Sequence, residues 1–382
     1  MAGLLEGVKV VELGGYGAAP FCTMMLGDLG AEVVKVESPT GDPYRENPPF
    51  VKDESLYFMS INRNKRSVCL DLKTPEDYQS FLTLLRGTDV VVHNLRPDVD
   101  RALKVDYASL CAQNPAIVYC SISGYGDSGP LRKEGAYDLI IQAYTGLMLL
   151  GGEESDPPLK VAPAVPDIAG AMCAAFAIVS CLFKRMSTGT GDYVEMSLFD
   201  ATLYSLALAY LPYYLGTGSS PGRWGSGHSL LVPMQAFKGA DSRYFVTGVT
   251  SEVMWTRFCA AIDHPELAGS YPSKEARIEF REQLVGKLTE IFIAQPAEFW
   301  VKRLSEHGVP SAPVLNLAEA LMHPQTRARG MLQTVDHPTT GSVTMIGTPF
   351  KLSKNPGSIR LPPPTLGQDK QYIPGEKEKK RF

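Results

Sequence analysis

Short runs of apolar, β-branched residues alternate with amphipathic segments over the first half of the chain. The short runs predict buried strands at residues 8–13, 31–36, 67–72, 90–93, 117–121 and 193–197. The segments between them predict helices at 20–29, 75–86 and 107–113. A strand, a helix and a strand within about thirty residues form a βαβ unit, which requires a parallel sheet. The repeated order predicts a doubly wound α/β domain.

The longest apolar stretch covers residues 168–185 and ends in Lys184 and Arg185, cations that suit the last turn of a helix. Its uncharged part, 168–183, is shorter than the ~20 residues that a helix needs to span a membrane. We therefore expect a buried helix and no membrane partner.

The pattern changes at residues 216–227 (GTGSSPGRWGSG), where Gly and Ser predict a boundary or a flexible loop. Beyond it, residues 235–248 predict a hairpin with its turn at 239–243. Residues 255–261 and 274–295 predict helices. We expect a large α/β domain over 1–204, a smaller α+β domain over 205–330, and a C-terminal segment over 331–382.

Composition narrows the functional classes. With 382 residues, 44% hydrophobic and 20% charged, the chain is globular and long enough for two domains. A net charge of −4 provides no general attraction for nucleic acid. The seven cysteines are scattered and never spaced Cys-x-x-Cys, so we expect no disulfide framework and no metal site. The N-terminus lacks the layout of a signal peptide, which favours a cytoplasmic location.

The first predicted strand is followed by GGYGAAP at residues 14–20, and Glu37 ends the next strand. This arrangement resembles a dinucleotide fingerprint. The position of the third glycine, however, holds Pro20, which cannot replace the residue that lets helix and strand pack closely. NAD binding is therefore not favoured. A glycine-rich turn that leads into a helix can still hold another anionic ligand.

Asp167 stands at the head of the long apolar segment, in PAVPDIAGAMCAAF. The simplest interpretation is a helix N-cap. A second interpretation is compatible with the first. The helix dipole and the free N–H groups keep a carboxylate ionised at that point, and the same groups can stabilise a nearby oxyanion. Gly170 would leave room for a substrate.

Other polar residues have structural and functional interpretations. Asp138 is most simply another N-cap, and Tyr137 is either a core residue or a hydrogen-bond donor. His228, in a glycine-rich loop, is either a surface residue or a ligand contact. His93 and Asn94 end a predicted strand, on the side where α/β sheets bind ligands.

These segments together resemble the class III CoA-transferases, a family that includes formyl-CoA and carnitine-CoA transferases and methylacyl-CoA racemases. The resemblance covers nearly the whole chain. It rests on LLEGVKVVEL, PFCTMMLGDLGAEVVKVE, NRNKRSVCLDLKTPE, VVVHNLRPDV, NPAIVYCSISGYGDSGP, YDLIIQAYTGLM, PDIAGAMCAAFAIVSCLFKRMSTGTGDYVEMSLFDA and HGVPSAPVLNLAEAL. It implies a Rossmann-like large domain built from both chain ends, a smaller domain between them, and an interlocked homodimer.

The resemblance also implies a mechanism. Asp167 aligns with the family nucleophile, which attacks an acyl-CoA thioester to form a mixed anhydride and then an aspartyl-CoA thioester. Coenzyme A is then a substrate, and no prosthetic group is expected. The implied CoA-binding positions are Leu72, Lys73, Asn94, Leu95, Arg101 and Tyr137. The implied acyl-pocket positions are Tyr16, Gly17, Ala18, Gly225, Gly227 and His228.

Three departures from the family pattern bear on specificity. Gly17 replaces a Gln of some formyl-CoA transferases, and Ser38 replaces an Arg that pairs with CoA phosphates, so we expect Arg45 to take over that pairing. Tyr137 stands where the racemase branch has His. Racemisation needs two groups that exchange protons near neutral pH, and a phenol with a pKa of ~10 is poorly suited to this.

Transfer is thus favoured over the alternative, 2-methylacyl-CoA racemisation. A CoA-binding module without turnover is the remaining alternative, and it would not require Asp167. Residues 223–228 (RWGSGH) are similar to the loop of succinyl-CoA:dicarboxylate CoA-transferases. We therefore expect a small dicarboxylic or hydroxy-dicarboxylic acid as the acceptor.

Overall fold

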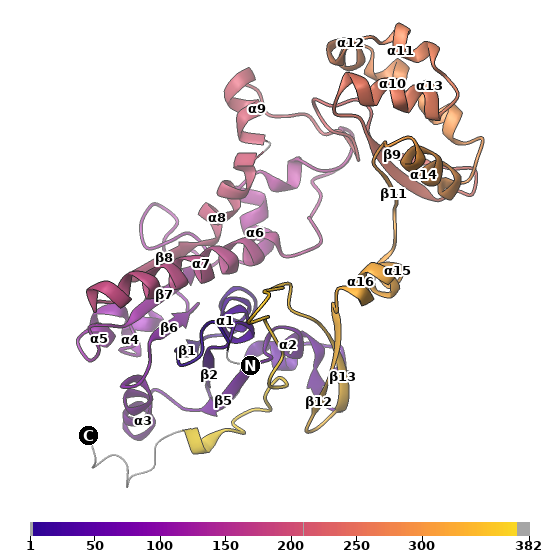
Figure 1. Ribbon diagram of the computed structural model, residues 1–382. Coiled ribbons are helices and arrows are strands. Elements are labelled where there is room, and N and C mark those ends of the chain that lie inside the picture. Colours follow the sequence, from indigo (N-terminus) through magenta and orange to yellow (C-terminus); the bar gives the residue numbers. More distant parts are fainter. Residues whose placement is uncertain (1–2, 209, 373–382) are drawn as a thin grey trace. The chain divides into compact units, whose positions relative to one another are not determined.

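The computed structural model describes residues 3–208 and 210–372, and the chain divides into two compact units (Figure 1). The first unit contains the chain up to Thr145, then Val161–Leu208, and the chain from Pro324 onward. The second contains Gly146–Lys160 and the segment that follows Leu208, up to His323. The short segment Gly146–Lys160 carries no composition signal that sets it apart from the residues around it.

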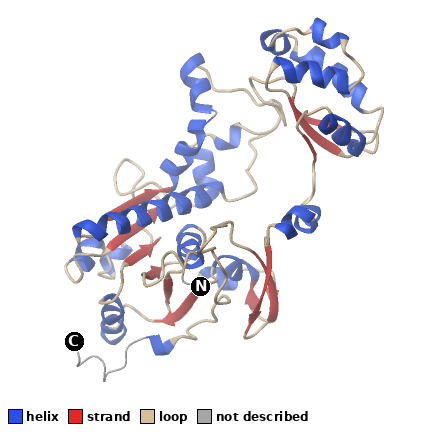
Figure 2. Ribbon diagram, viewed as in Figure 1, coloured by secondary structure: helices blue, strands red, loops and turns tan. Residues whose placement is uncertain are grey.

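A six-stranded sheet in the order β5-β2-β1-β6-β7-β8 forms the centre of the first unit (Figure 2). All of its neighbouring strands pair in parallel. The strands are β1 (Lys9–Leu13), β2 (Glu32–Glu37), β5 (Lys65–Cys69), β6 (Val90–His93), β7 (Val118–Ser123) and β8 (Tyr193–Ser197). The predicted parallel α/β architecture is confirmed. The predicted strand 67–72 is misplaced, because the ladder with β2 begins at Lys65.

Alternate residues of the strands face two separate cores, as both faces of the sheet are covered. On one face Val10 and Val33 pack with helices α1 (Ala18–Asp28) and α7 (Val165–Thr188). On the other face Val11 and Val34 pack with the helices that the pattern predicted at 75–86 and 107–113, which are α3 (Pro75–Leu85) and α5 (Tyr107–Cys111). Each fully buried valine contributes roughly 1.5–3 kcal/mol of apolar burial.

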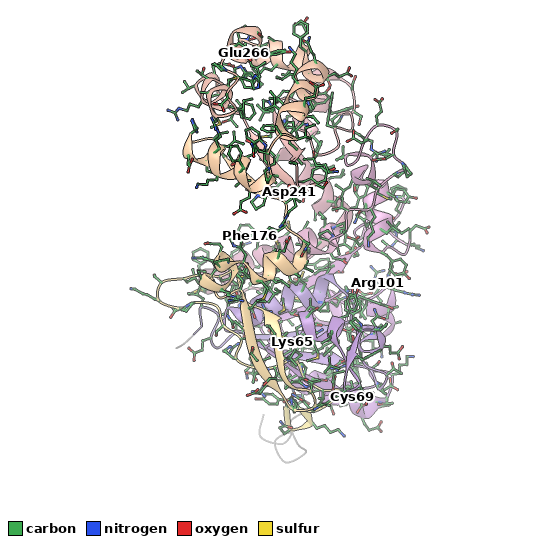
Figure 3. All side chains as sticks on the ribbon, turned by 90° about the vertical axis from the view of Figure 1, so that its right-hand side faces the viewer. Lys65, Cys69, Arg101, Phe176, Asp241 and Glu266 are labelled. Atoms are coloured by element: carbon green, nitrogen blue, oxygen red, sulfur yellow. The ribbon has the colours of Figure 1, made fainter. Side chains whose placement is uncertain are left out.

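Helix α7 is longer than predicted, and it is buried on one side only. Gly170, Ala171, Ala174 and Ile178 are buried against the sheet layer, whereas Phe176 is 77% exposed (Figure 3). The expectation of a buried helix is therefore wrong for the outer face. With 24 residues, α7 passes a length and hydropathy test for a membrane span, but the core helix of a water-soluble protein passes the same test.

The second unit is built around an antiparallel sheet in the order β11-β10-β9. The predicted hairpin is confirmed as β9 (Met234–Lys238) and β10 (Tyr244–Gly248), and β11 (Ser311–Pro313) completes the sheet. Phe245, Phe258 and Phe292 lie in its core. Its helices are α9 (Tyr210–Thr217), α10 (Glu252–Ala261), α11 (Glu266–Ser270), α12 (Lys274–Glu279), α13 (Arg281–Phe292), α14 (Ala297–Glu306) and α15 (Leu317–Met322). The single helix predicted over 274–295 is divided at Phe280.

The other elements of the first unit are shorter and lie around the sheet. They are η1 (Pro43–Glu46), β3 (Phe50–Val51), β4 (Glu54–Ser55), α2 (Leu56–Ile61), α4 (Val99–Ala102), α6 (Asp138–Tyr144), α8 (Leu198–Ser205), η3 (Leu206–Leu208), α16 (Pro324–Ala328), β12 (Leu332–His337), β13 (Gly341–Ile346) and η4 (Lys370–Tyr372). The 3-10 helix η2 (Leu147–Leu149) belongs to the second unit.

Candidate active site

The turn after β1 is held rigidly from strand β6. Asn94 accepts the Gly15 N–H at 3.1 Å through Oδ1 and donates to the Gly15 carbonyl at 2.7 Å through Nδ2. Gly14 has φ +113°, and a Cβ at that position would lie 2.2 Å from the Asn94 Oδ1. Only glycine fits there. Tyr16 follows with φ +60°, an uncommon conformation for a residue with a side chain.

Gly17 lies directly against Asp167. Gly17 is the N-cap residue of α1, and a Cβ at this position would lie 2.6 Å from the Asp167 Oδ2 and 3.0 Å from its Cγ. A side chain at position 17, such as the Gln of some formyl-CoA transferases, has no room in this arrangement. The first turns of α1 and α7 therefore meet at the Asp167 carboxylate, with Ala18 as the first helical residue of α1.

Asp167 is the third residue of α7, and the N-cap is Ala164. The prediction that Asp167 caps the helix is wrong. Pro166 explains the difference, because a proline in the first helical turn has a backbone angle suited to a helix and needs no N–H partner there. The carboxylate still lies in the first turn, where the helix dipole favours negative charge.

The electrostatic environment of Asp167 opposes its ionisation. Burial and, to a smaller extent, the nearby Asp138 carboxylate together raise the pKa of Asp167 to about 6. Burial therefore works against the stabilisation of the charged form that the helix end was predicted to provide. Within residues 3–208 and 210–372, no ion pair or hydrogen bond compensates the Asp167 carboxylate. At pH 7 it is ionised in most molecules and poorly solvated, which suits a nucleophile.

Helix α6 presents the two residues predicted near this site. Tyr137 is the N-cap residue and is 66% exposed, and Asp138 is the first helical residue. The prediction of Asp138 as an N-cap is wrong. Its Oδ2 accepts a hydrogen bond from Gln142 at 2.7 Å, one turn along α6, while its charge acts on Asp167.

Two tyrosines that the sequence did not predict lie beside Tyr16. The rings of Tyr16 and Tyr44 meet edge to face at 5.5 Å, and Tyr44 packs on Tyr57 at 5.8 Å. Burial raises the pKa of Tyr44, and the Asp167 charge adds to the effect, so the phenol lies within electrostatic reach of that carboxylate. The aromatic rings of Tyr16 and Tyr44 thus lie near the candidate nucleophile.

A cavity of about 580 Å³ opens at the carboxyl ends of β1, β2 and β6. Strand β1 lies between β2 and β6, so the strand order reverses there, and α/β sheets bind ligands at such a switch point. Five of the predicted site residues line this cavity together, namely Tyr16, Leu72, Lys73, Asn94 and Leu95. These five predicted positions therefore share one surface, whose lining residues do not include Gly17 or Asp167.

Two arginines predicted to bind CoA, Arg101 and Arg45, are not among the residues that line this cavity. Arg101 lines a different cavity, of about 450 Å³, and pairs loosely with Asp98 at 3.7 Å. Arg45 donates twice to Glu37 at 2.8 Å and to the Pro364 carbonyl at 3.2 Å. These bonds occupy the Arg45 guanidinium and argue against a phosphate role. Arg96, two residues beyond Asn94 in the same loop, lines both cavities and was not predicted.

Gly225, Gly227 and His228 belong to the second unit. Hydrogen bonds to backbone carbonyls tie the end of this loop to other segments of the second unit. Gly225 donates to the Gly152 carbonyl at 2.9 Å, and Arg281 donates to the carbonyls of His228 and Ser229. The His228 Nδ1 accepts the Leu230 N–H at 3.0 Å, which leaves the proton of the neutral ring on Nε2.

Known proteins share this chain's sequence over nearly its whole length. The family model for CoA-transferase family III matches residues 5–370. A human protein named succinyl-CoA:glutarate CoA-transferase is 36% identical over 373 residues, 97% of this chain and 85% of that protein. The succinyl-CoA:mesaconate CoA-transferase of Haloarcula marismortui is 37% identical over 381 residues, which cover 97% of this chain and 96% of that protein.

The fold has a close counterpart among solved structures. The crystal structure of a CAIB/BAIF family protein from Brucella suis matches with a TM-score of 0.86 at 33% identity. The match covers 98% of this chain and 99% of that one. The sequence matches and the fold agree, and the chain belongs to CoA-transferase family III.

Proposed function

We propose that this enzyme transfers CoA between an acyl-CoA thioester and a small dicarboxylic acid, with Asp167 as the covalent nucleophile. The observation that carries the proposal is the Asp167 carboxylate itself, which is partly buried, uncompensated by a cation, and in contact with Gly17. Relatives named for succinyl-CoA with glutarate or mesaconate support the dicarboxylate. Gly17 is packed closely against Asp167, which supports a dicarboxylate substrate over formyl transfer.

The proposed reaction consists of exchanges between carboxylates and one thiolate. An Asp167 oxygen attacks the thioester carbon, and CoA leaves as the thiolate, which produces a mixed anhydride. The thiolate then attacks the aspartyl carbonyl, so the donor acid leaves and an aspartyl-CoA thioester remains. The acceptor carboxylate displaces CoA through a second anhydride, and the thiolate attacks the acceptor's acyl carbon to release the new thioester and regenerate Asp167. Covalent catalysis of this kind divides one difficult exchange between two carboxylates into easier steps.

The first turns of α1 and α7 support the negative charge that develops in these steps. The N–H groups of a first helical turn have no partner within their own helix, and the positive end of the dipole lies there. A tetrahedral oxyanion formed next to Asp167 would lie near two such ends. Preorganised donors of this kind typically contribute about 2.7–4 kcal/mol to transition-state stabilisation.

We place the CoA moiety in the cavity of about 580 Å³ at the switch point. Lys73 and Arg96 are the cations available there for the phosphates, and Leu72 and Leu95 offer apolar surface for the adenine. Arg101 is a second candidate for phosphate binding from the neighbouring cavity, and Tyr137 faces solvent at the start of α6.

We further propose a homodimer that covers the outer face of α7. Exposed apolar residues follow one another on this face at steps of four and three, a spacing typical of helix–helix contacts. They are Met172, Phe176, Val179, Phe183 and Met186. A second copy of the chain is the partner that the family resemblance implies. Sedimentation should show a dimer, and Phe176→Asp with Phe183→Asp should dissociate it, whereas a monomeric wild type would contradict the proposal.

All seven cysteines are unpaired, which supports a reducing, cytoplasmic setting.

The chemistry is tested by offering succinyl-CoA with glutarate, mesaconate, oxalate or acetate and separating the CoA esters formed. We expect the dicarboxylates to be the better acceptors. Hydroxylamine added during turnover should convert Asp167 to its hydroxamate, which peptide mass spectrometry locates. Asp167→Ala should abolish both signals and keep CoA affinity. Exchange of the α-proton from an acyl-CoA in deuterated water without any acceptor acid would instead identify a racemase.

A further inference from the structure

Six charged side chains are buried together beneath the turn that contacts Asp167. Three are anionic and three cationic, so their charges cancel. They are Glu12, Lys35, Glu37, Asp42, Arg45 and Lys65, and none of their side chains is more than 12% exposed. Burying each charge costs several kcal/mol, which good pairing recovers only in part. Such a cluster therefore calls for an explanation other than stability.

Lys35 lies at the centre of this cluster. Its ammonium contacts the Glu12 Oε1 at 2.5 Å, the Asp42 Oδ2 at 2.7 Å and the Gly14 carbonyl at 3.2 Å. The Glu12 and Gly14 oxygens accept hydrogen bonds from the ammonium, and the Asp42 Oδ2 pairs with it as an ion. Lys35 thus joins strands β1 and β2 to the start of the glycine turn, and it holds the Asp42 side chain in one place.

Asp42 carries this constraint to the turn itself. Its Oδ1 accepts the Tyr16 N–H at 3.2 Å and the Tyr44 N–H at 2.9 Å. A single carboxylate oxygen therefore holds the backbones of both tyrosines whose rings meet at 5.5 Å. Tyr16 has φ +60°, a conformation that costs about 1–3 kcal/mol and persists only where the surroundings enforce it. The Asp42 Oδ1 also lies 2.7 Å from where a Cβ on Gly15 would be.

The next residue, Gly17, is the one that touches the Asp167 carboxylate. We propose that Asp42, anchored by Lys35, is a positioning residue: it sets the Tyr16–Gly17 backbone and the Tyr44 ring around the nucleophile. The inference rests on the proposed function, because it assigns a purpose to the geometry around Asp167. A misplacement of about 1 Å at a reacting group can cost about 10²-fold in rate.

The opposite end of helix α1 offers a matched control. Asp28 is equally buried and accepts from Arg63 at 2.9 and 2.6 Å and from Asn64 at 2.8 Å. That cluster holds the C-terminal segment through the Ser358 and Ile346 carbonyls and touches none of the candidate site residues. Asp28→Asn therefore removes a buried carboxylate charge of the same kind, in the same helix layer, away from the nucleophile.

The experiment compares Asp42→Asn with Asp28→Asn in single-turnover formation of the hydroxylamine-sensitive aspartyl species and in steady-state kinetics. Both variants should lower the melting temperature. Only Asp42→Asn should lower kcat and the acylation rate, by about 10²-fold, with the KM for the acyl-CoA donor changed less than about threefold. Equal kcat values in the two folded variants would overturn the inference.

Asp42→Glu is a second variant in case Asp42→Asn does not fold. It keeps the charge that pairs with Lys35 and moves the acceptor oxygen away from the Tyr16 and Tyr44 N–H groups. A reduced kcat with a near-native melting temperature supports positioning, and a native kcat contradicts it. If wild type itself forms no trapped aspartyl species, the proposed function fails instead, so the two failures are distinguishable.

Discussion

Glu12 and Asp167 are two carboxylates of the same unit with opposite electrostatic surroundings. Burial alone would raise the pKa of Glu12, but Lys35 and Lys65 outweigh it and hold that pKa at about 2. Asp167 is less buried, yet burial and, to a smaller extent, the Asp138 charge raise its pKa to about 6, because no cation in the described part of the chain lies beside it to oppose them. Depth of burial alone therefore does not decide the state of a carboxylate here. Adjacent cations reverse its effect at Glu12, and their absence leaves it in force at Asp167.

The difference separates structural carboxylates from a reactive one. Glu12 is fully paired, with Thr23 donating to it at 2.5 Å in addition to the two lysines, and it has no capacity left for a substrate. No residue of the part of the chain that the structure describes donates a hydrogen bond to the Asp167 carboxylate. A poorly solvated carboxylate is more reactive toward a thioester than a well-paired one, because it loses fewer stabilising interactions when its charge is used to form the new bond.

The largest expected effect comes from Asp167→Asn, which keeps the shape and removes the charge. We expect transfer activity to fall by more than about 10³-fold, because an amide cannot form the anhydride. Stability should rise at pH 7. An ionised carboxylate with a raised pKa destabilises the folded state above pH 6, and this penalty disappears as the pH falls from 6 towards 3.8.

The stability part of this prediction is measured by thermal unfolding of both proteins at pH 7.5 and pH 4. The variant should be more stable by on the order of 2 kcal/mol at the higher pH and by less at the lower one. A variant that is less stable than wild type at pH 7.5 would show that Asp167 makes a stabilising contact and is not an uncompensated charge.

Glu12→Gln makes the same chemical change at the other carboxylate, and its effect on stability should have the opposite sign. The amide leaves Lys35 and Lys65 without their shared anion in a fully buried site. Removing one partner from a buried ionic group typically costs about 3–5 kcal/mol. Urea unfolding at pH 7 measures the loss. Arg101→Ala is the control, since its pair with Asp98 is exposed and should contribute well under 1 kcal/mol.

The sequence predicted the sheet well, because buried parallel strands are nearly continuous apolar runs, and 90–93 and 193–197 match to the residue. It could not predict the charge cluster. Glu12, Lys35 and Lys65 lie within the strands β1, β2 and β5. Nothing in a one-dimensional pattern shows that a charged residue in one strand faces a charge in another. Asp167 was identified from a family motif, while its raised pKa depends on burial and on Asp138, both of which only the fold determines.

Gly17→Ala tests the close approach of α1 to the nucleophile and should have an intermediate effect. The new methyl would lie 2.6 Å from the Asp167 Oδ2, so the carboxylate must move. We expect kcat to fall by about 10- to 100-fold with little change in melting temperature. Gly87→Ala is the matched control, because its Cβ would meet only the Lys9 Nζ, at 3.7 Å. Equal activity of both variants would mean that the carboxylate can turn away without loss.

The smallest effect is expected from Asp138→Asn, and it concerns pH. If only ionised Asp167 attacks, wild-type kcat/KM should rise with pH through about 6 and then level off. Asn at position 138 removes the neighbouring charge and can still accept from Gln142 through its amide oxygen. The pKa of Asp167 then falls, and the midpoint of the rise moves to lower pH. It should not reach the ordinary 3.8, because burial is the larger cause and remains.

At pH 5 the Asp138→Asn variant should therefore keep a greater share of its own plateau activity than wild type does. Asp200→Asn, an exposed carboxylate in the first turn of α8, should leave the midpoint in place. A midpoint that stays fixed in Asp138→Asn would assign the raised pKa of Asp167 to burial alone. The contrast with Glu12 would then rest only on the two lysines, since the acidic neighbour of Asp167 would contribute nothing.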